Sequence, residues 1–268
     1  GCQSVYTLPQ NATIHPVPDA DFSVNTTTSC NLNQSFSFTN LSSGASSAFW
    51  DFGDGTTSTQ LNPSKVYGAP GTYSVKLRVT SANGCLDSLA RNNYITIHAP
   101  VSPQIVANDS AGCEPFAVNF TQNITNAASY SWNFGNGTTS SNAAASVNYP
   151  SAGNFPVSLS VTMNNGCSYS ANSVPVTVFP KPIPQFTLSN TNGCAPLTVT
   201  LNNQSQGGSN YIVNWGLGVA VPLVQNSFSF TEPGLYSVAV GAFSAQGCYA
   251  VLNQPAAVQV LAPVAAFV

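Results

Sequence analysis

The chain has 268 residues, of which 43% are hydrophobic and only 5% are charged, and its formal net charge at pH 7 is −3. Soluble globular domains usually carry about 25% charged residues, so this composition is unusual. The small negative charge argues against binding to nucleic acid or to an anionic membrane surface. No apolar run reaches the roughly 18 residues that a transmembrane helix requires, so no membrane insertion is expected.

One sequence unit occurs three times along the chain. Its tryptophans recur at a nearly constant interval, and so do its Gly-Cys pairs. The positions are Trp50, Trp132 and Trp215 for the tryptophans, and Cys85, Cys167 and Cys248 for the cysteines. A period of about 82 residues predicts a tandem array of small domains.

Proline-containing joints separate the repeats, which we place at residues 19–99, 100–180 and 181–262. Residues 1–18 resemble the end of the first repeat and are predicted to be the last strands of a preceding repeat. Residues 263–268 resemble an opening strand and are predicted to start a following repeat. The chain is therefore expected to be a window from a longer array. The alternative is a true terminus whose lone strand completes a neighbouring subunit.

Each repeat is predicted to be all-β. In the first repeat, apolar residues alternate with polar ones from Tyr73 to Thr80, which is the pattern of a strand with one buried face. Equivalent strands are expected from Phe155 and from Tyr236. Turn signals recur at short intervals, and no amphipathic helix is apparent. About 80 residues with roughly seven short strands predict a β-sandwich for each repeat.

Two aspartates lie among glycines in "WDFGDG", at residues 50–55. The second repeat has "WNFGNG" at the equivalent place, and the third has "WGLG". Asparagine replaces aspartate readily in a tight turn, but it is a poor substitute for a carboxylate that binds calcium. A hairpin turn is therefore the main prediction, and calcium bound by Asp51 and Asp54 in the first repeat is the alternative.

Six of the seven cysteines are expected to form one disulfide within each repeat, because the two cysteines of a repeat have a nearly constant separation. The expected pairs are Cys30–Cys85, Cys113–Cys167 and Cys194–Cys248, with Cys2 bonded to a cysteine outside the sequence. No closely spaced pair of the C-x-x-C type suggests zinc. Disulfides predict a secreted, extracellular protein.

The motifs "WDFGDG" and "NPSKVYGAPGTYSVKLRV" in the first repeat resemble the PKD domain, an immunoglobulin-like sandwich. "GCAPLTVTLNNQS" and "SANGCLDS" are similar to the cysteine-bearing PKD repeats of large Bacteroidota surface proteins, which include gliding-motility adhesins exported by the type IX pathway. The resemblance covers all three repeats and is weakest in the third. It implies tandem immunoglobulin-like sandwiches in an extracellular setting, and it fixes no ligand.

No enzyme and no cofactor are predicted, because no nucleophile elbow, metalloprotease motif or phosphate-binding loop occurs in the sequence. Two short motifs, "DSL" and "DSA", resemble the O-glycosylation acceptor of Bacteroidota. They make Ser88 and Ser110 candidate glycosylation sites, with a solvated turn serine as the alternative reading.

An apolar strip is expected on the outward face of the third repeat. Ala239 and Gly241 stand where the first repeat has Lys76 and Arg78, and Phe243 continues the strip. Such a strip is typical of an interface, and cover by a loop of the same repeat is the alternative.

Three functions fit the sequence. The first is a rigid, non-enzymatic stalk within a long surface adhesin or filament, whose partners are neighbouring PKD repeats and, as a further contact, other copies of the chain. The second is a glycan- or surface-binding module that uses Tyr169, Tyr211 or Tyr249. The third is a spacer in a secreted hydrolase.

Overall fold

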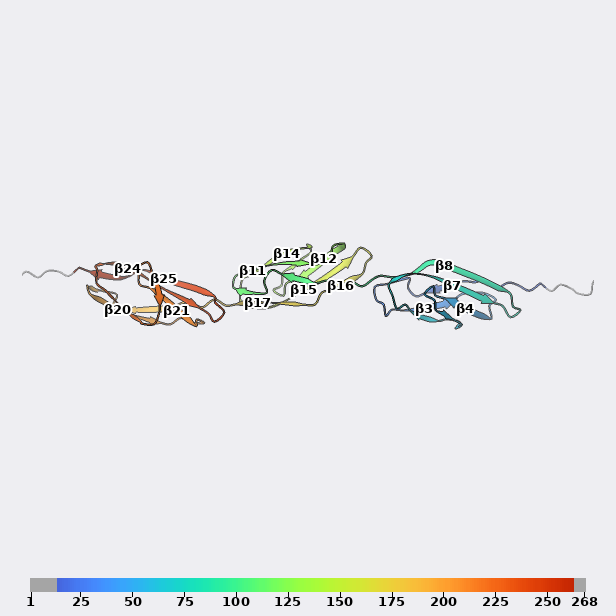
Figure 1. Ribbon diagram of the computed structural model, residues 1–268, viewed down its shortest axis with the longest axis horizontal. Helices are drawn as coiled ribbons and strands as arrows, with labels where there is room; N and C mark the ends of the chain where they lie inside the picture. Colours follow the sequence, from blue (N-terminus) through green and yellow to red (C-terminus); the bar gives the residue numbers. More distant parts are fainter. Residues whose placement is uncertain (1–13, 263–268) are drawn as a thin grey trace, which may run out of the picture. The chain divides into compact units, whose positions relative to one another are not determined.

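The computed structural model describes residues 14–262, and this part of the chain is all-β. It contains no helix, so no described helix could cross a membrane. The described residues form three sandwiches, each made of a three-stranded and a larger sheet (Figure 1). The predicted fold class is confirmed. Residues 1–13, with Cys2, and residues 263–268 lie outside the described range, as do the predictions made for them.

In the first sandwich, a sheet of three strands packs against a sheet of five strands. The small sheet has the order β1 (Phe22–Val24), β3 (Ser35–Asn40), β6 (Ser64–Val66). The large sheet has the order β2 (Thr28–Ser29), β8 (Leu86–Ile97), β7 (Gly71–Thr80), β4 (Ser47–Asp51), β5 (Thr57–Ser58). All pairings in this sandwich are antiparallel except that of β2 with β8.

The second sandwich repeats this strand order. Its small sheet contains β14 (Ala145–Tyr149), β11 (Phe116–Gln122) and β9 (Ile105–Ala107). Its large sheet contains β10 (Ala111–Cys113), β17 (Val174–Phe179), β15 (Gly153–Met163), β12 (Ala127–Asn133) and β13 (Thr139–Ser140), and β16 (Ser168–Ser170) also pairs with β15. The parallel pair here is β10 with β17, which is the counterpart of β2 with β8.

The third sandwich has the same order again. Its small sheet contains β18 (Phe186–Ser189), β20 (Leu197–Asn203) and β23 (Ser227–Phe230). Its large sheet contains β19 (Asn192–Cys194), β25 (Tyr249–Leu261), β24 (Gly234–Phe243), β21 (Asn210–Asn214) and β22 (Ala220–Pro222). All three repeats therefore place a short strand with a cysteine at or just after its end parallel to the last strand of the repeat.

The alternating apolar residues of the sequence form the cores. In β7, Val75, Leu77 and Val79 are fully buried, whereas Lys76 and Arg78 between them are exposed. The same rule buries alternate residues in β15, and in β24 it buries Val238, Val240 and Ala242, although Gly241 between the last two is buried as well. In the first core Trp50 packs edge-on against Phe22, with ring centroids 5.2 Å apart. Phe22 belongs to the small sheet and Trp50 to the large one, so this contact joins the two sheets of the first sandwich. Buried apolar residues lie within each of the three repeats.

A buried tyrosine closes the core of the first and second sandwiches. The Tyr67 hydroxyl donates to the Phe52 carbonyl at 3.1 Å, and the Tyr149 hydroxyl donates to the Phe134 carbonyl at 3.0 Å. Both rings are fully buried. Burial raises the pKa of Tyr67 and raises the pKa of Tyr149 to about 12, because a phenolate would lose its hydration there.

These tyrosines predict a loss of stability in alkali. An unfolded tyrosine has a pKa near 10, so above that pH the folded chain holds protons that the unfolded chain releases. The stabilisation is complete below pH 10 and is lost as the pH rises through about 12. Denaturant titrations between pH 9 and pH 12 should show this decline. Tyr67→Phe combined with Tyr149→Phe should make it shallower, while costing about 1 kcal/mol per lost hydrogen bond at pH 9. An unchanged decline in the double variant would contradict this account.

Candidate functional site

The glycine-rich stretch at residues 50–55 is a hairpin turn between β4 and β5, as predicted. The Asp51 carboxylate accepts the Gly53 N–H at 2.9 Å, and the Asp54 carboxylate accepts both the N–H and the hydroxyl of Thr56. Asn133 and Asn136 accept the equivalent bonds in the second repeat. Aspartate and asparagine therefore accept the same hydrogen bonds in this turn.

Calcium at Asp51 and Asp54 stays a prediction, and in this structure one of the two carboxylates is paired with a lysine. Asp54 Oδ2 lies 2.6 Å from Lys65 Nζ. Over residues 14–262 no group of three or more His, Cys, Asp or Glu side chains gathers in a way that could hold a metal ion. Partial burial acts to raise the pKa of Asp54, but hydrogen bonds from Lys65 and Thr56 outweigh it and leave the pKa below its ordinary value.

Asp54→Asn tests the turn against the calcium alternative. The amide oxygen of the variant should keep the bonds to Thr56 and lose only the ion pair, so the free energy of unfolding at pH 7 should fall by less than about 1 kcal/mol. The contribution of the ion pair is present above the unfolded pKa near 4 and is lost as the pH falls through the lower folded pKa. Millimolar calcium should leave the melting temperature of both chains unchanged. A calcium-dependent rise that Asp54→Asn abolishes would establish the metal site instead.

The tryptophan of the third repeat does not occupy the position that its spacing suggests. Val240 in β24 is the counterpart of Leu77 in β7, because each lies four residues after the tyrosine of its strand. Trp50 pairs with Leu77 and Val213 pairs with Val240, so Val213 is the counterpart of Trp50. Trp215 follows two residues later and takes the place of Phe52. The alignment of Trp215 with Trp50 is therefore wrong by two residues. Leu217, which that alignment sets opposite Phe52, is 56% exposed.

A valine at this position leaves space that the larger indole ring fills in the other repeats. A hollow of about 480 Å³ opens there in the third repeat. Its lining is mostly apolar and includes Val213, Trp215, Leu217, Val219, Val221 and Phe228. In the first repeat the Trp50 ring fills the corresponding place, and its indole N–H donates to the Gln60 carbonyl at 3.0 Å.

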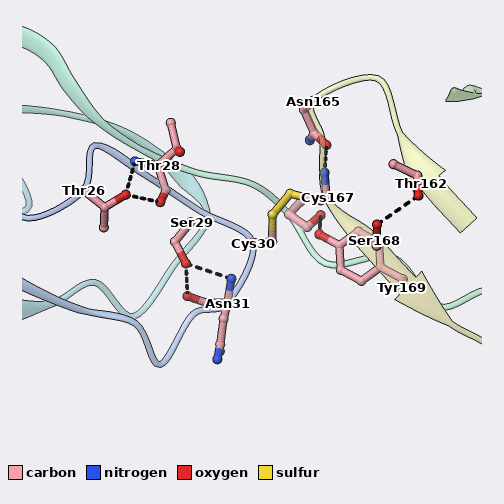
Figure 2. Close-up of a disulfide and its surroundings, with 11 residues drawn as sticks. Thr26, Thr28, Ser29, Cys30, Asn31, Thr162, Asn165, Cys167, Ser168 and Tyr169 are labelled. Carbon is pink, nitrogen blue, oxygen red and sulfur yellow. Dashed lines mark hydrogen bonds between the residues drawn. A yellow bond between two sulfur atoms is a disulfide. The ribbon is translucent and has the colours of Figure 1, made fainter.

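Four cysteines of the described chain form disulfides that link one repeat to the next. A disulfide joins Cys30 to Cys167, with an S–S distance of 1.97 Å and a Cα–Cα distance of 5.6 Å (Figure 2). Cys30 directly follows β2. The Ser29 carbonyl accepts the N–H of His98, which lies just before the joint. Cys30 is therefore located in space beside the joint that leads to the second repeat. Cys167 lies in the tight turn between β15 and β16 of the second repeat. The bond therefore connects two consecutive repeats.

Hydrogen bonds hold both halves of this disulfide. The Ser29 hydroxyl accepts the N–H of Asn31 at 2.9 Å, and the Asn165 side chain accepts the N–H of Cys167 at 3.0 Å (Figure 2). The Tyr169 hydroxyl lies 3.4 Å from the Ala99 carbonyl, to which it donates. Residues 126–128 and 162–169 of the second repeat accordingly group with the first repeat in one compact unit.

A second disulfide repeats the pattern one unit further along the chain. Cys113, the last residue of β10, bonds to Cys248 in the turn between β24 and β25, with a Cα–Cα distance of 5.6 Å. Glu114 beside it was not singled out from the sequence. Its carboxylate accepts the N–H of Ala152 at 2.7 Å and the N–H of Lys181, in the joint, at 3.1 Å. This disulfide also crosses from one repeat to the next.

The predicted pairs Cys30–Cys85, Cys113–Cys167 and Cys194–Cys248 are therefore wrong. Cys85 directly precedes β8, whereas Cys30 follows Ser29, which pairs with the last residue of β8. Twelve residues of strand separate these points, which is about 40 Å at the usual rise per residue. A disulfide needs Cα atoms within about 7 Å, so the two cysteines of one repeat cannot meet. In the second repeat Cys167 precedes β16, whereas Cys113 pairs with the last residue of β17. In the third repeat Cys248 precedes β25, whereas Cys194 pairs with the last residue of β25.

The candidate glycosylation sites are both exposed. Ser88 lies within β8 rather than in a turn, and the neighbouring Asp87 accepts the Ala20 N–H at 2.8 Å. Ser110 lies between β9 and β10, and its carbonyl accepts the Thr177 N–H. Glycosylation of either serine stays a prediction.

Part of the apolar strip in the third repeat is covered by a neighbouring strand. Gly241 is buried, and a Cβ there would lie 2.8 Å from the Tyr249 ring of β25. The same ring packs against Phe243, with centroids 4.7 Å apart. Ala239 is half-buried, and Val251 next to the strip is 55% exposed. An interface at Ala239, Gly241 and Phe243 stays a prediction.

The tyrosines considered for glycan binding all have partners within the chain. Tyr169 donates to Ala99, Tyr249 packs on Phe243, and the Tyr211 hydroxyl donates to the Gly208 carbonyl at 2.9 Å. Each of these side chains therefore has a structural contact, and glycan binding stays a prediction.

Comparisons with known proteins agree with this architecture. The family model described as "PKD domain" matches residues 13–97 and 98–178, which together are more than half of the chain. Among curated proteins, the collagenase ColA of Bacillus cereus is 58% identical over 38 residues, a match that covers 14% of this chain and 4% of that protein. The chain thus spans only a small part of the length of the curated relatives that it matches.

Single PKD domains of known structure are also similar to part of the chain. The PKD1 domain of Vibrio anguillarum Epp is 31% identical, with 31% of this chain and 98% of that chain covered and a TM-score of 0.27. The PKD1 domain of the Vibrio cholerae metalloprotease PrtV is 32% identical, with 31% and 100% covered and a TM-score of 0.27. The matched ranges of the family model and the repeated sandwiches lead to one conclusion: the chain belongs to the PKD domain family.

Proposed function

We propose that this chain is an extracellular, non-enzymatic stalk in which disulfides fix each PKD repeat to the next. One observation carries the proposal: both disulfides of the described chain join consecutive repeats rather than closing a loop within one. PKD domains are non-catalytic modules that act as structural units or spacers. A disulfide framework of this kind belongs in an oxidising compartment outside the cytoplasm.

A second covalent link changes what a joint can do. Two domains connected only by a short peptide can swing about it, even when prolines stiffen it. When a disulfide joins the same two domains at a second point, bending of one domain away from the other stretches a covalent bond. The joint in the first pair is further tied by the Tyr169 hydroxyl on the Ala99 carbonyl. Restricting the bending of every joint in this way suits a stalk that must hold another domain at a distance.

The larger setting of the stalk is proposed from the sequence resemblance. We place it in a long surface adhesin or filament of the kind that Bacteroidota export by the type IX pathway, including gliding-motility adhesins. Its partners would be neighbouring PKD repeats, with self-association or another surface protein or glycan as further contacts. The collagenases among its relatives make the spacer of a secreted hydrolase the other setting in this class.

The test is whether the disulfide restricts the joint. Residual dipolar couplings give an alignment tensor for each repeat, and two repeats that move as one body share the same tensor. We expect equal tensors for the first and second repeats of the oxidised chain. Cys30→Ser combined with Cys167→Ser should make them unequal.

Cys85→Ser serves as the matched control, because Cys85 is free and its loss leaves both disulfides in place. This variant should behave like the unaltered chain. Unequal tensors in the oxidised chain, or equal tensors after the disulfide is removed, would contradict the proposed stalk.

A further inference from the structure

Two cysteines of the described chain are unpaired, and each has the surroundings of a bonded one. Cys85 is half-buried and Cys194 is exposed. Cys85 lies in a turn where the Ser81 N–H donates to the Cys85 carbonyl and the Gly84 N–H donates to the Ser81 carbonyl. The turn of the bonded Cys248 has the same two bonds, made by Ser244 and Gly247.

The finer details of these two turns also agree. The Ser81 hydroxyl accepts the Cys85 N–H at 3.2 Å, as the Ser244 hydroxyl accepts the Cys248 N–H at 3.1 Å. Gly84 and Gly247 both have φ of +82°. The turn that presents a cysteine for bonding is thus fully built at Cys85.

Cys194 matches the other kind of bonded cysteine. It ends β19 and pairs in parallel register with Leu261, as Cys113 ends β10 and pairs with Phe179. The residue after each cysteine donates its N–H to that strand partner at 3.0 Å, from Ala195 to Leu261 and from Glu114 to Phe179. The strand that holds Cys113 for bonding has a full counterpart at Cys194.

Both observed disulfides follow one rule of direction. The strand-end cysteine of one repeat bonds to the turn cysteine of the repeat that follows it. Cys194 is a strand-end cysteine, and Cys85 is a turn cysteine. Bonding them to each other would join the third repeat back to the first, against this direction.

We infer that Cys194 and Cys85 are docking points for further PKD repeats in the same tandem array: Cys194 bonds to the turn cysteine of a following repeat, and Cys85 to the strand-end cysteine of a preceding one. The inference rests on the proposed stalk and names its partner at either end. In each new bond two thiols lose two protons and two electrons to form one S–S bond. The oxidant is a protein or small-molecule disulfide, which is reduced to two thiols by exchange.

The experiment extends the chain by one repeat. A copy of residues 100–180 is added after residue 262, so that its first proline stands where Pro263 stands in the chain. Cys2→Ser removes the cysteine outside the described range, and serine replaces the Cys113 equivalent of the added copy. After oxidation, non-reduced peptide mapping should show Cys194 linked to the Cys167 equivalent of the added copy. Cys85 should be the one titratable thiol left.

A matched control replaces that Cys167 equivalent with serine. Cys194 should then stay free, giving two titratable thiols instead of one. The inference is overturned if Cys194 remains free in the first extended chain, or is found linked to Cys85, while Cys30–Cys167 and Cys113–Cys248 form. If those two disulfides themselves fail to form, the proposed stalk fails with them, so the two outcomes are distinguishable.

Discussion

Pulled from residues 14 and 262, the oxidised chain is expected to reach a fully unfolded length of about 300 Å, against about 850 Å after reduction, at roughly 3.4 Å per residue. The difference arises because a disulfide carries the pulling force directly between two distant residues, so the residues between them do not extend. The shortest covalent path runs from residue 14 to Cys30, backwards from Cys167 to Cys113, and on from Cys248 to residue 262. That path contains only about a third of the residues.

Removing one disulfide distinguishes bonds between repeats from bonds within them. In Cys30→Ser combined with Cys167→Ser, only one bond of the observed set is lost, and the length should rise to about 390 Å. Had the cysteines paired within repeats, the same two substitutions would break two bonds and give about 670 Å. Single-molecule force–extension curves recorded with and without reductant resolve these lengths. A double variant near the longer value would contradict the pairing between repeats.

A single methyl group at Gly53 should be among the most damaging changes in the first repeat. Gly53 has φ of +76°, and a Cβ there would lie 2.3 Å from the Ser74 carbonyl oxygen in the adjacent strand β7. Backbone strain and this clash act together, so Gly53→Ala should lower the free energy of unfolding of the first sandwich by about 3 kcal/mol or more. Amide hydrogen exchange of the first repeat measures this loss separately from the other sandwiches.

Gly55 provides the matched control two residues away. It has φ of +85°, but nothing lies within 4 Å of the Cβ that alanine would add. Gly55→Ala should therefore cost only the left-handed backbone strain, about 1 kcal/mol. Equal losses in the two variants would mean that the approach of Ser74 to Gly53 is unimportant.

The sequence allowed the strands and the turn to be predicted because both depend on local rules. Alternation from Tyr73 to Thr80 follows directly from the pleat of a strand with one buried face. The exchange of Asp51 for Asn133 between repeats identified a turn, because a turn needs only a side-chain oxygen in that place. Neither inference required knowledge of distant parts of the chain.

The disulfide pairing could not be read from spacing alone. A constant interval within repeats implies a constant interval between the strand-end cysteine of one repeat and the turn cysteine of the next, so both patterns fit. What decides is the length of β8, which carries Cys85 and Cys30 to opposite ends of one sandwich. Strand length depends on pairing across the sheet, which the sequence pattern of β8 did not reveal.

The misplacement of Trp215 had a signal in the sequence. Trp132 and Trp215 lie two residues further apart along the chain than Cys167 and Cys248 do. This difference equals the shift that the sheet register shows at Val213. The cysteine spacing was the better guide for aligning the repeats. A tryptophan can stand two residues further along the strand in another repeat and still face the core.

The direction of the disulfides has a consequence for how such arrays change in length. In the proposed array the strand-end cysteine of each repeat bonds to the next repeat and its turn cysteine bonds to the previous one. Duplication or deletion of a whole repeat therefore leaves each remaining cysteine opposite a complementary one. A crossover between genes that falls at equivalent points of any two repeats preserves this match. The number of repeats can therefore change between related proteins without leaving an additional cysteine unpaired. Natural variation in the length of this region is expected to come in whole repeats.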